Sequence, residues 1–334
     1  RDPYKIMISE FMLQQTRIET VLPYYDRFLR AFPSLSHLAG APLQRVLRLW
    51  AGMGYYARAR NLHAAARIII KDWGGKIPSA KEDLRGLPGF GPYTAGAVAS
   101  IAFNQRAPAL DGNVKRVLSR LSGISDSVSP LSQKRLLENF GEDLIPEGSA
   151  SEFNQALMDL GAMVCLPARP KCSSCPVRKS CSFPASEKKT PKPQERYRRK
   201  EVWAVALLEN KGRFLIHRKD GRGLLVGLWQ FPTVVIPPGQ KEERQKEVLR
   251  AGLRKLFGIK TQFQKSLPPL QHSFTHIQAT LRPYFLSLSP AQHAPQTALG
   301  PSARWIKLTD LDRYPVSRAM MKVADLLKSG VNGV

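Results

Sequence analysis

The stretch "LPGFGPYTAGAVAS", Leu87 to Ser100, decides the fold of the first half of this chain. Gly89 and Gly91 predict a tight turn, and the small residues that follow predict a closely packed helix. Such a turn presents bare backbone N–H groups at a helix N-terminus, where a phosphate can bind. Taken alone, the pattern is also typical of an ordinary glycine turn between packed helices, so its meaning depends on the rest of the sequence.

Helical periodicity surrounds this turn, and the period changes in the second half of the chain. "LQRVLRLWAGM", "ARNLHAAARIIIKDW" and "GNVKRVLSRLSGI" repeat apolar residues every three or four positions. Further on, strands are predicted for "VWAVALLE", "GRFLIHR", "LLVGLWQFP" and "ATLRPYFLSLS". A helix that ends at Gly258 is predicted for "QKEERQKEVLRAGLRKLFG". Between the halves, residues 183–200 are proline-rich and basic, which predicts a linker. We expect an all-α domain at 1–182 and a smaller α+β domain at 201–334.

Composition favours a polyanion as the partner of this protein. The 334 residues exceed what one core usually covers, which agrees with two domains. The chain carries 51 Lys and Arg against 26 Asp and Glu, a net charge of +25. Such a balance favours nucleic acid first and an anionic membrane surface second. No apolar run is long enough to span a bilayer and no signal peptide is evident, so we expect a cytoplasmic protein, in a bacterium where DNA shares that compartment.

All four cysteines fall in one short stretch, "CLPARPKCSSCPVRKSC". Cys165, Cys172, Cys175 and Cys181 follow the spacing C-x6-C-x2-C-x5-C. Thiolates this close in sequence need only local chain to converge on one metal ion or cluster. Four thiolates also suit a structural zinc ion, and the spacing alone does not exclude it.

Two carboxylates stand out because of their apolar surroundings. Glu10 lies in "SEFMLQQT", on an apolar run that ends in a short polar tip. Asp111 lies in "LDGNVKR", between an apolar run and the expected start of a helix. Glu10 is compatible with a solvated helix face, and Asp111 with a plain helix N-cap. Two carboxylates in one pocket would instead suit glycosidic bond cleavage, with one acid and one anion.

These motifs, taken in order, resemble the helix-hairpin-helix, iron–sulfur base-excision glycosylases, and within them the MutY-type adenine DNA glycosylases. The resemblance rests on the cysteine loop and on five further stretches: "SEFMLQQT", "LWAGMGYYARARNLHAAA", "LPGFGPYTAGAVAS", "LDGNVKRVLSR" and "FNQALMDLGAMVC". It implies a 4Fe-4S cluster on the four cysteines and double-stranded DNA with an A:8-oxoguanine or A:G mispair as the substrate. It also implies no membrane, a monomeric protein and a further helix before Arg1.

The resemblance implies roles for individual residues. The adenine is flipped out of the duplex, Glu10 protonates it, Asp111 supports the oxocarbenium-like sugar, and Tyr93 and Asn113 position these groups. Gln15 fills the gap in the stack and Tyr55 wedges beside 8-oxoguanine. The residues expected to contact DNA or the lesion are Leu13, Gln14, Gln15, Thr16, Tyr55, Arg58, Gly89, Gly91, Phe274, Thr275 and His276.

Two alternatives remain open within this resemblance. Endonuclease III-type enzymes remove oxidised pyrimidines and cut the strand with a lysine that attacks the sugar. The matching position holds Tyr93, which cannot form an imine, so the sequence favours a monofunctional glycosylase with weak or no strand cleavage. A protein that binds lesions without catalysis is the other alternative.

The second half resembles, more loosely, the Nudix-like C-terminal domain of the same family. A Nudix hydrolase holds Mg²⁺ through the glutamates of R-E-x-x-E-E-x-G. With the last glycine aligned on Gly258, the expected acids are replaced by Gly252, Lys255 and Leu256. We therefore expect a domain that no longer hydrolyses pyrophosphate. The resemblance implies that its loop "HSFTHI" contacts 8-oxoguanine, although a hairpin turn without a ligand would suit the same letters.

Overall fold

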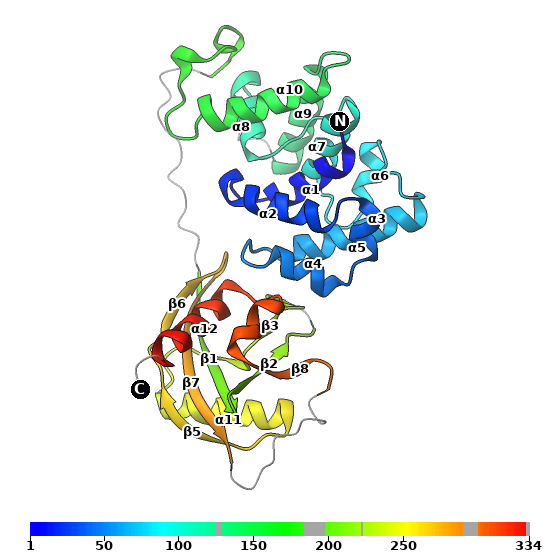
Figure 1. Cartoon of the computed structure of the whole chain (residues 1–334). Helices are drawn as coiled ribbons and strands as arrows, with labels where there is room; N and C mark the ends of the chain where they lie inside the picture. Colours follow the sequence, from blue (N-terminus) through cyan, green and yellow to red (C-terminus); the bar gives the residue numbers. More distant parts are fainter. Residues whose placement is uncertain (125–128, 184–197, 222, 290–299, 332–334) are drawn as a thin grey trace. The chain divides into compact units, whose positions relative to one another are not determined.

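The computed structural model describes residues 1–124, 129–183, 198–221, 223–289 and 300–331 (Figure 1). The chain forms two compact units, one of residues 1–41 and 57–194 and one of residues 42–56 and 195–334. The segment 42–56 thus groups with the C-terminal part, although it lies inside the expected helical domain. The domain boundaries drawn from the sequence stay predictions, and most of the expected linker, residues 184–197, lies outside the described residues.

The first unit is helical in its described residues, as the apolar periodicity predicts. Helices α1 and α2 are followed by α3, and α5 leads through the short α6 into α7, the helix of the glycine turn. Helix α7 packs against α1, α6 and α10. The bounds are α1 Pro3–Leu13, α2 Ile18–Ala31, α3 Leu35–Gly40, α5 Ala57–Asp72, α6 Lys81–Arg85, α7 Pro92–Phe103, α8 Gly112–Ser122, α9 Pro130–Asp143 and α10 Ala150–Asp159.

Close packing around α7 depends on small residues. A Cβ atom added at Gly96 would lie 2.5 Å from the carbonyl oxygen of Pro108, so only glycine fits there. Val98 and Ser100 are fully buried on the same helix. Helix α7 is therefore surrounded by other chain, which explains why it lacks the polar face of an ordinary surface helix.

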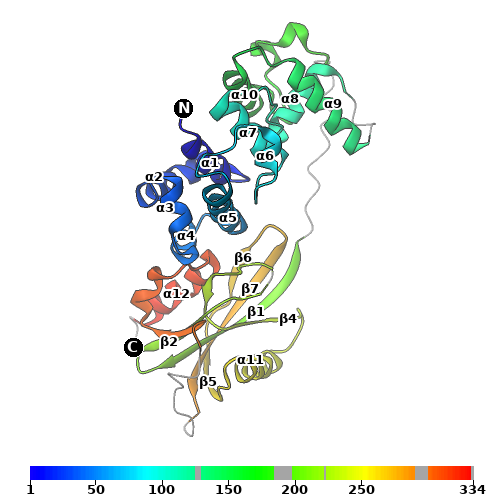
Figure 2. The same ribbon diagram turned by 90° about the vertical axis from the view of Figure 1, so that its right-hand side faces the viewer.

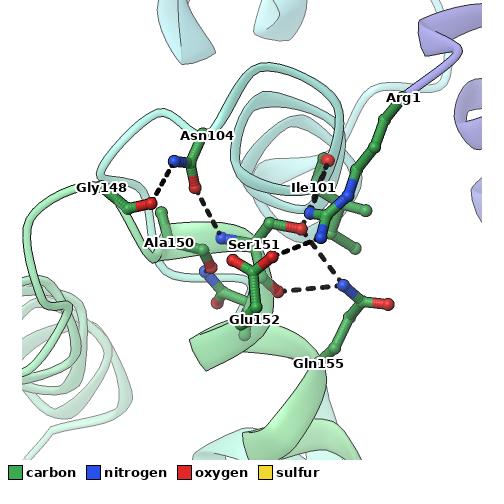
Figure 3. A network of polar contacts seen from close by, with 9 residues as sticks. Arg1, Ile101, Asn104, Gly148, Ala150, Ser151, Glu152 and Gln155 are labelled. Carbon is green, nitrogen blue, oxygen red and sulfur yellow. Dashed lines mark hydrogen bonds and ion pairs between the residues drawn. The ribbon is translucent and has the colours of Figure 1, made fainter.

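A polar network joins the ends of three helices in this unit (Figure 3). Asn104, in the left-handed conformation at the end of α7, donates to the Gly148 carbonyl and accepts from the backbone N–H of Ser151 at 3.0 Å. Arg1, two residues before α1, pairs with Glu152 on the first turn of α10. These bonds satisfy main-chain groups that helix ends leave open, and they hold α7 and α10 together.

After α10 the chain makes a π-helical turn and enters the cysteine loop. The turn η1 spans Leu160–Val164, and two short 3-10 turns, η2 Cys172–Ser174 and η3 Arg178–Ser180, lie between the later cysteines. A Cβ atom at Gly161 would lie 2.8 Å from Cβ of Asn113, so this turn approaches the start of α8 closely.

The second unit contains helix α4 and a mixed sheet with two further helices. Parallel pairing of β1 with β7 forms its centre, and β2, β4, β5, β6 and β8 add antiparallel neighbours. Figure 2 shows α11 and α12 on opposite sides of this sheet. The bounds are α4 Leu43–Trp50, β1 Arg199–Asn210, β2 Arg213–Arg218, β3 Trp229–Gln230, β4 Thr233–Ile236, α11 Glu242–Phe257, β5 Thr261–Ser266, β6 Leu270–Ser273, β7 Ile277–Leu288, β8 Ala303–Ile306, η4 Leu308–Arg313 and α12 Arg318–Val331.

Most expected elements of this unit form, with one difference. Gly258 ends α11 with φ +67°, as the sequence predicts. The stretch "LLVGLWQFP" contributes only the two residues of β3, because Leu225 and Gly227 take φ values of +64° and +82° and turn the chain. Among the described residues, no helix combines the length and apolarity that a membrane span requires.

Candidate functional site

Glu10 is a buried acid on the last turn of α1. Its side chain is 6% exposed, and its Oε2 atom accepts a hydrogen bond of 2.8 Å from the Tyr93 hydroxyl. Burial raises the pKa of Glu10 from 4.5 to about 7; the Tyr93 hydrogen bond lowers it in part, and the charge of Asp111 raises it further. The alternative of a solvated surface glutamate is therefore excluded, and Glu10 can hold a proton near neutral pH.

Asp111 lies close enough to act on both of these groups. It is the N-cap of α8, and its Oδ1 accepts from the backbone N–H of Val114 at 2.6 Å. Its charge raises the pKa of Glu10, and it also contributes to the pKa of Tyr93, which burial raises well above its ordinary value. The cap interpretation of Asp111 is thus confirmed. Three side chains from the end of α1 and the starts of α7 and α8 share one electrostatic environment.

The polar tip after α1 has a defined conformation. Gln15 is exposed at φ +56°, and Gln14 donates a 2.9 Å bond to the Thr94 hydroxyl on α7. Leu13 and Thr16 are half-buried on either side. The tip therefore presents Gln15 to solvent while Gln14 anchors it to the helix that carries Tyr93.

Arg58 holds this tip in place from within the protein. The residue is 7% exposed, and its Nη1 atom donates to the carbonyl oxygens of Met12 at 2.7 Å and of Gln14. Its Nη2 atom donates to the Thr16 hydroxyl at 2.9 Å. Carbonyls at the end of a helix lack partners within the helix, and this guanidinium supplies them. The predicted contact of Arg58 with DNA stays a prediction beside these internal bonds.

The tight turn that the sequence predicts at Gly89 and Gly91 is present, but the two glycines have different structural roles. Gly89 has φ +81°, and a Cβ atom there would lie 2.7 Å from Cβ of Asn61 and from a ring carbon of Phe11. Gly91 has φ −68°, is the N-cap of α7, and has open space where a Cβ would lie. Gly89 is therefore required by the fold, whereas Gly91 leaves the helix start open toward solvent.

Asn113 lies on the side of α8 that faces the cysteine loop. Its Oδ1 atom accepts a 2.8 Å bond from Arg116, whose guanidinium also donates to the carbonyls of Gly161 and Cys165. Within the described residues, no hydrogen bond joins Asn113 to Glu10 or Tyr93. Its predicted positioning role stays a prediction.

The four cysteines line one cavity of about 220 Å³. Arg120 on α8 approaches it, with Nη1 3.3 Å from Sγ of Cys165 and hydrogen bonds to the carbonyls of Leu166 and Pro167. In the part of the chain that the structure describes, no three His, Cys, Asp or Glu side chains are grouped tightly enough for a single metal ion. The thiols thus surround a shared space, and none of them forms a disulfide.

The second unit brings together two residues that are 220 positions apart. The Thr275 hydroxyl, in the turn between β6 and β7, donates to the Tyr55 hydroxyl at 3.1 Å. Phe274 of the same turn stacks on Trp203 with ring centroids 5.1 Å apart, and His276 is exposed. Tyr55 is 41% exposed at φ +48°. The predicted lesion contacts Tyr55, Phe274, Thr275 and His276 therefore form one partly exposed group.

The basic helix α11 leaves no room for an acid at one position of the Nudix motif. A Cβ atom at Gly252 would lie 2.6 Å from Cγ2 of Val234 on β4, so no larger side chain fits at that position of the motif. Lys255 and Leu256 are exposed. The expectation of a domain without this carboxylate set agrees with the packing of α11.

Two contacts were not evident from the sequence. The bonds of Arg58 to main-chain carbonyls and the approach of Arg120 to a cysteine sulfur depend on segments more than 40 residues away. The only sequence signal for either is an arginine within an otherwise apolar helical pattern, which also suits a surface position. Such contacts become visible only in the folded chain.

Comparison with known proteins agrees with these two units. Residues 8–143 match the HhH-GPD superfamily of base excision DNA repair proteins, and residues 204–326 match the NUDIX domain. The chain is 35% identical over 373 residues to the adenine DNA glycosylase of Homo sapiens, covering 97% of this chain and 68% of that protein. It is 33% identical over 299 residues to the adenine DNA glycosylase of Buchnera aphidicola, covering 86% and 80%. A solved structure of a thermostable thymine-DNA glycosylase superposes with a TM-score of 0.51 at 35% identity, covering 55% of this chain and 84% of that chain.

The helical unit, its paired carboxylates and these matches define a helix-hairpin-helix DNA glycosylase that is joined to a Nudix-like domain. Within that class, the chain belongs to the adenine DNA glycosylase family. The fold class and the family resemblance drawn from the sequence are both confirmed.

Proposed function

We propose that this glycosylase removes adenine that is paired with 8-oxoguanine, or with guanine, in duplex DNA. The observation that carries the proposal is the buried Glu10 carboxyl, hydrogen-bonded to Tyr93 and raised to a pKa of about 7 beside Asp111. Neutral adenine is a poor leaving group, and its departure requires a proton donor together with an anion near the sugar. Glu10 and Asp111 supply these two groups from different helices.

The reaction begins when the adenine leaves the base stack and reaches Glu10 and Asp111. The exposed Gln15 would fill the gap, held by the Gln14–Thr94 bond and by Arg58. Glu10 then gives its proton to the adenine ring as the N-glycosidic bond breaks. The bonding electrons leave with adenine, and the negative charge of Asp111 stabilises the sugar cation until water adds to it. The added water gives up one proton, which restores the Glu10 carboxyl. The products are adenine and an abasic site.

Tyr93 supports a hydrolytic reaction over a lyase reaction. Its hydroxyl stays protonated, because burial and the nearby carboxylates raise its pKa, and it donates to Glu10. A lyase needs an amine that forms a Schiff base with the sugar. Borohydride treatment during turnover should therefore trap no covalent protein–DNA product, whereas an abundant trapped product would support the endonuclease III-like alternative.

The group formed by Tyr55 and Thr275 supports recognition of the base opposite the adenine. A tyrosine ring that is partly exposed on a left-handed backbone is suited to wedge between bases, and Thr275 fixes its hydroxyl. We propose that this group contacts 8-oxoguanine. A duplex with 8-oxoguanine should bind more tightly than the same duplex with guanine, and Tyr55→Ala should reduce that difference. A location in the bacterial cytoplasm and a monomeric state stay predictions.

We further propose that Cys165, Cys172, Cys175 and Cys181 hold a 4Fe-4S cluster. The four thiols line a single cavity, and four thiolates are the ligand set of such a cluster. When bound, the cluster would cross-link the loop after α10. The purified protein should be brown and contain iron and acid-labile sulfide. Stoichiometric zinc without iron would contradict this assignment.

The test of the proposed function is base release from a defined duplex. The native protein, in excess over a duplex with A opposite 8-oxoguanine, should yield alkali-labile sites at the adenine. Asp111→Asn and Glu10→Gln should abolish them while binding to the duplex persists. An uncleaved strand with the native protein would overturn the enzymatic assignment, and tight binding without cleavage would favour the lesion-binding alternative.

A further inference from the structure

Helix α4 leads into the loop that carries Tyr55, and contacts within the second unit fix both of its ends. The side chains of Val46, Leu47 and Trp50 on this helix are fully buried. A helix of eight residues has little stability of its own, so its place depends on what it contacts. The polar contacts of α4 therefore help to decide where the Tyr55 loop lies.

Gln44, on the first turn of α4, joins this helix to strand β3 and the turn before it. Its amide nitrogen donates to the Gly227 carbonyl at 2.9 Å, and its amide oxygen accepts from the indole N–H of Trp229 at 2.9 Å. A Cβ atom at Gly227 would lie 3.1 Å from Cδ1 of Leu47, so the helix and the turn are also in close apolar contact. One side chain thus uses a donor and an acceptor to hold the start of α4.

Trp229 connects this contact to the chain that enters α12. Its backbone N–H donates to the Pro315 carbonyl at 2.9 Å, and it forms an isolated parallel bridge with Val316. The Tyr56 hydroxyl accepts from the backbone N–H of Gly52 at 3.2 Å and makes a long contact of 3.5 Å to the Val316 carbonyl. The same short segment therefore contacts both the start of α4 and the loop after it.

The loop after α4 has a constrained backbone, and this makes its anchoring important for Tyr55. Gly52, Gly54 and Tyr55 take φ values of +96°, +80° and +48°, and the left-handed conformation is unfavourable for tyrosine. The indole N–H of Trp50 donates to the Gly54 carbonyl at 3.1 Å. The Tyr55 hydroxyl accepts from the Thr275 hydroxyl at 3.1 Å. The Tyr55 ring is therefore presented by a loop whose conformation depends on contacts around it.

We propose that Gln44 is a positioning residue for recognition of the base opposite the adenine. By fixing α4 and its loop, Gln44 holds Tyr55 beside Thr275, and this role rests on the proposed function of that pair. A loop that must be ordered on binding lowers the affinity for the duplex that it contacts most. The acid Glu10 belongs to the other unit, so the chemical step should not depend on Gln44.

Binding titrations by fluorescence anisotropy test this role. All proteins are full-length and carry Glu10→Gln, so that two duplexes, with A opposite 8-oxoguanine and A opposite guanine, stay intact. The preference is the ratio of the two dissociation constants. Gln44→Met should lower this preference about fivefold, by weakening the duplex with 8-oxoguanine, and Tyr56→Phe should lower it less. Gln262→Met, at an exposed glutamine of β5, is the matched control and should keep the native preference.

A double-mutant cycle separates a positioning role from a merely structural one. In a Tyr55→Ala background, Gln44→Met should weaken the duplex with 8-oxoguanine no further, because the ring that it positions is gone. A structural role would weaken binding equally in both backgrounds. With Glu10 intact and the protein saturating, Gln44→Met should release adenine opposite guanine within about twofold of the native rate.

Three results would overturn the proposal. A native preference that Gln44→Met retains would overturn the positioning role alone and leave the proposed function standing. An equal loss with and without the Tyr55 ring would show that Gln44 acts only on the stability of the second unit. A native protein without any preference would overturn the proposed role of Tyr55 together with that of Gln44. If Gln44→Met unfolds in a thermal scan, Tyr56→Phe, which keeps the aromatic ring, decides by the same cycle.

Discussion

Replacement of Glu10 by glutamine should abolish activity and yet stabilise the helical unit at alkaline pH. The pKa of the carboxyl is raised from 4.5 to about 7, mainly by burial. A tenfold change in proton affinity corresponds to about 1.4 kcal/mol, so an ionised Glu10 costs the folded state about 3 kcal/mol. The pKa of Glu10 is higher in the folded state than in the unfolded state. The contribution of protonated Glu10 to stability is therefore fully present below about pH 4.5 and is lost as the pH rises through about 7.

Glutamine keeps the shape of the side chain and an oxygen that accepts from Tyr93, but it never ionises. Glu10→Gln should therefore exceed the native protein in unfolding free energy by about 3 kcal/mol near pH 8, and by about 1 kcal/mol near pH 5. In a unit of this size the larger value corresponds to roughly 6–12 °C in melting temperature. Differential scanning calorimetry at the two pH values measures it.

The matched control is Glu147→Gln, at an exposed glutamate in the loop before α10, which should show the same small effect at both pH values. If the stabilisation in Glu10→Gln did not grow between about pH 5 and pH 8, the buried carboxyl would not be held protonated by its surroundings. The proposed acid would then lack its physical basis.

Further predictions concern positions where the packing is explicit. Gly89→Ala should destabilise the helical unit by about 2 kcal/mol or more, because φ at Gly89 is positive and an added Cβ atom clashes. Gly91→Ala should change stability by about 0.5 kcal/mol or less. Thermal unfolding of the two variants measures the difference. Arg58→Met should lower the free energy of unfolding by about 2–3 kcal/mol and slow adenine release at least about tenfold, because buried carbonyls lose their donor. Arg58→Lys should restore part of both the stability and the rate. Gly252→Glu should destabilise the second unit by about 1–3 kcal/mol through its clash with Val234, and should gain no pyrophosphatase activity in a phosphate-release assay.

Much of the fold could be predicted from local patterns. The end of α11 at Gly258 follows from a backbone conformation that glycine adopts at little cost, and the N-cap at Asp111 follows from a side chain that bonds its own helix. The two residues of β3 show where this reasoning stops. An apolar run suggested a longer strand, but Leu225 takes a positive φ that no local pattern indicates.

The site could be predicted in its residue types but not in its geometry. Glu10 and Asp111 are 101 positions apart, and only the packing of α1, α7 and α8 brings Asp111 near enough to raise the pKa of Glu10. Arg58 shows a further limit, because nothing in the local sequence indicated its bonds to carbonyl oxygens of the α1 end. Contacts between distant segments depend on the whole packing of the chain, which periodicity and spacing do not encode.

The pH dependence of adenine release tests the central claim, that Glu10 is the proton donor, most directly. Under single-turnover conditions with a duplex that contains A opposite 8-oxoguanine, the rate should be constant below about pH 7 and fall about tenfold for each pH unit above it. Glu10→Gln should show no release at any pH. A rate that stays level or rises above about pH 7, or release by Glu10→Gln, would contradict the assignment of Glu10 as the acid.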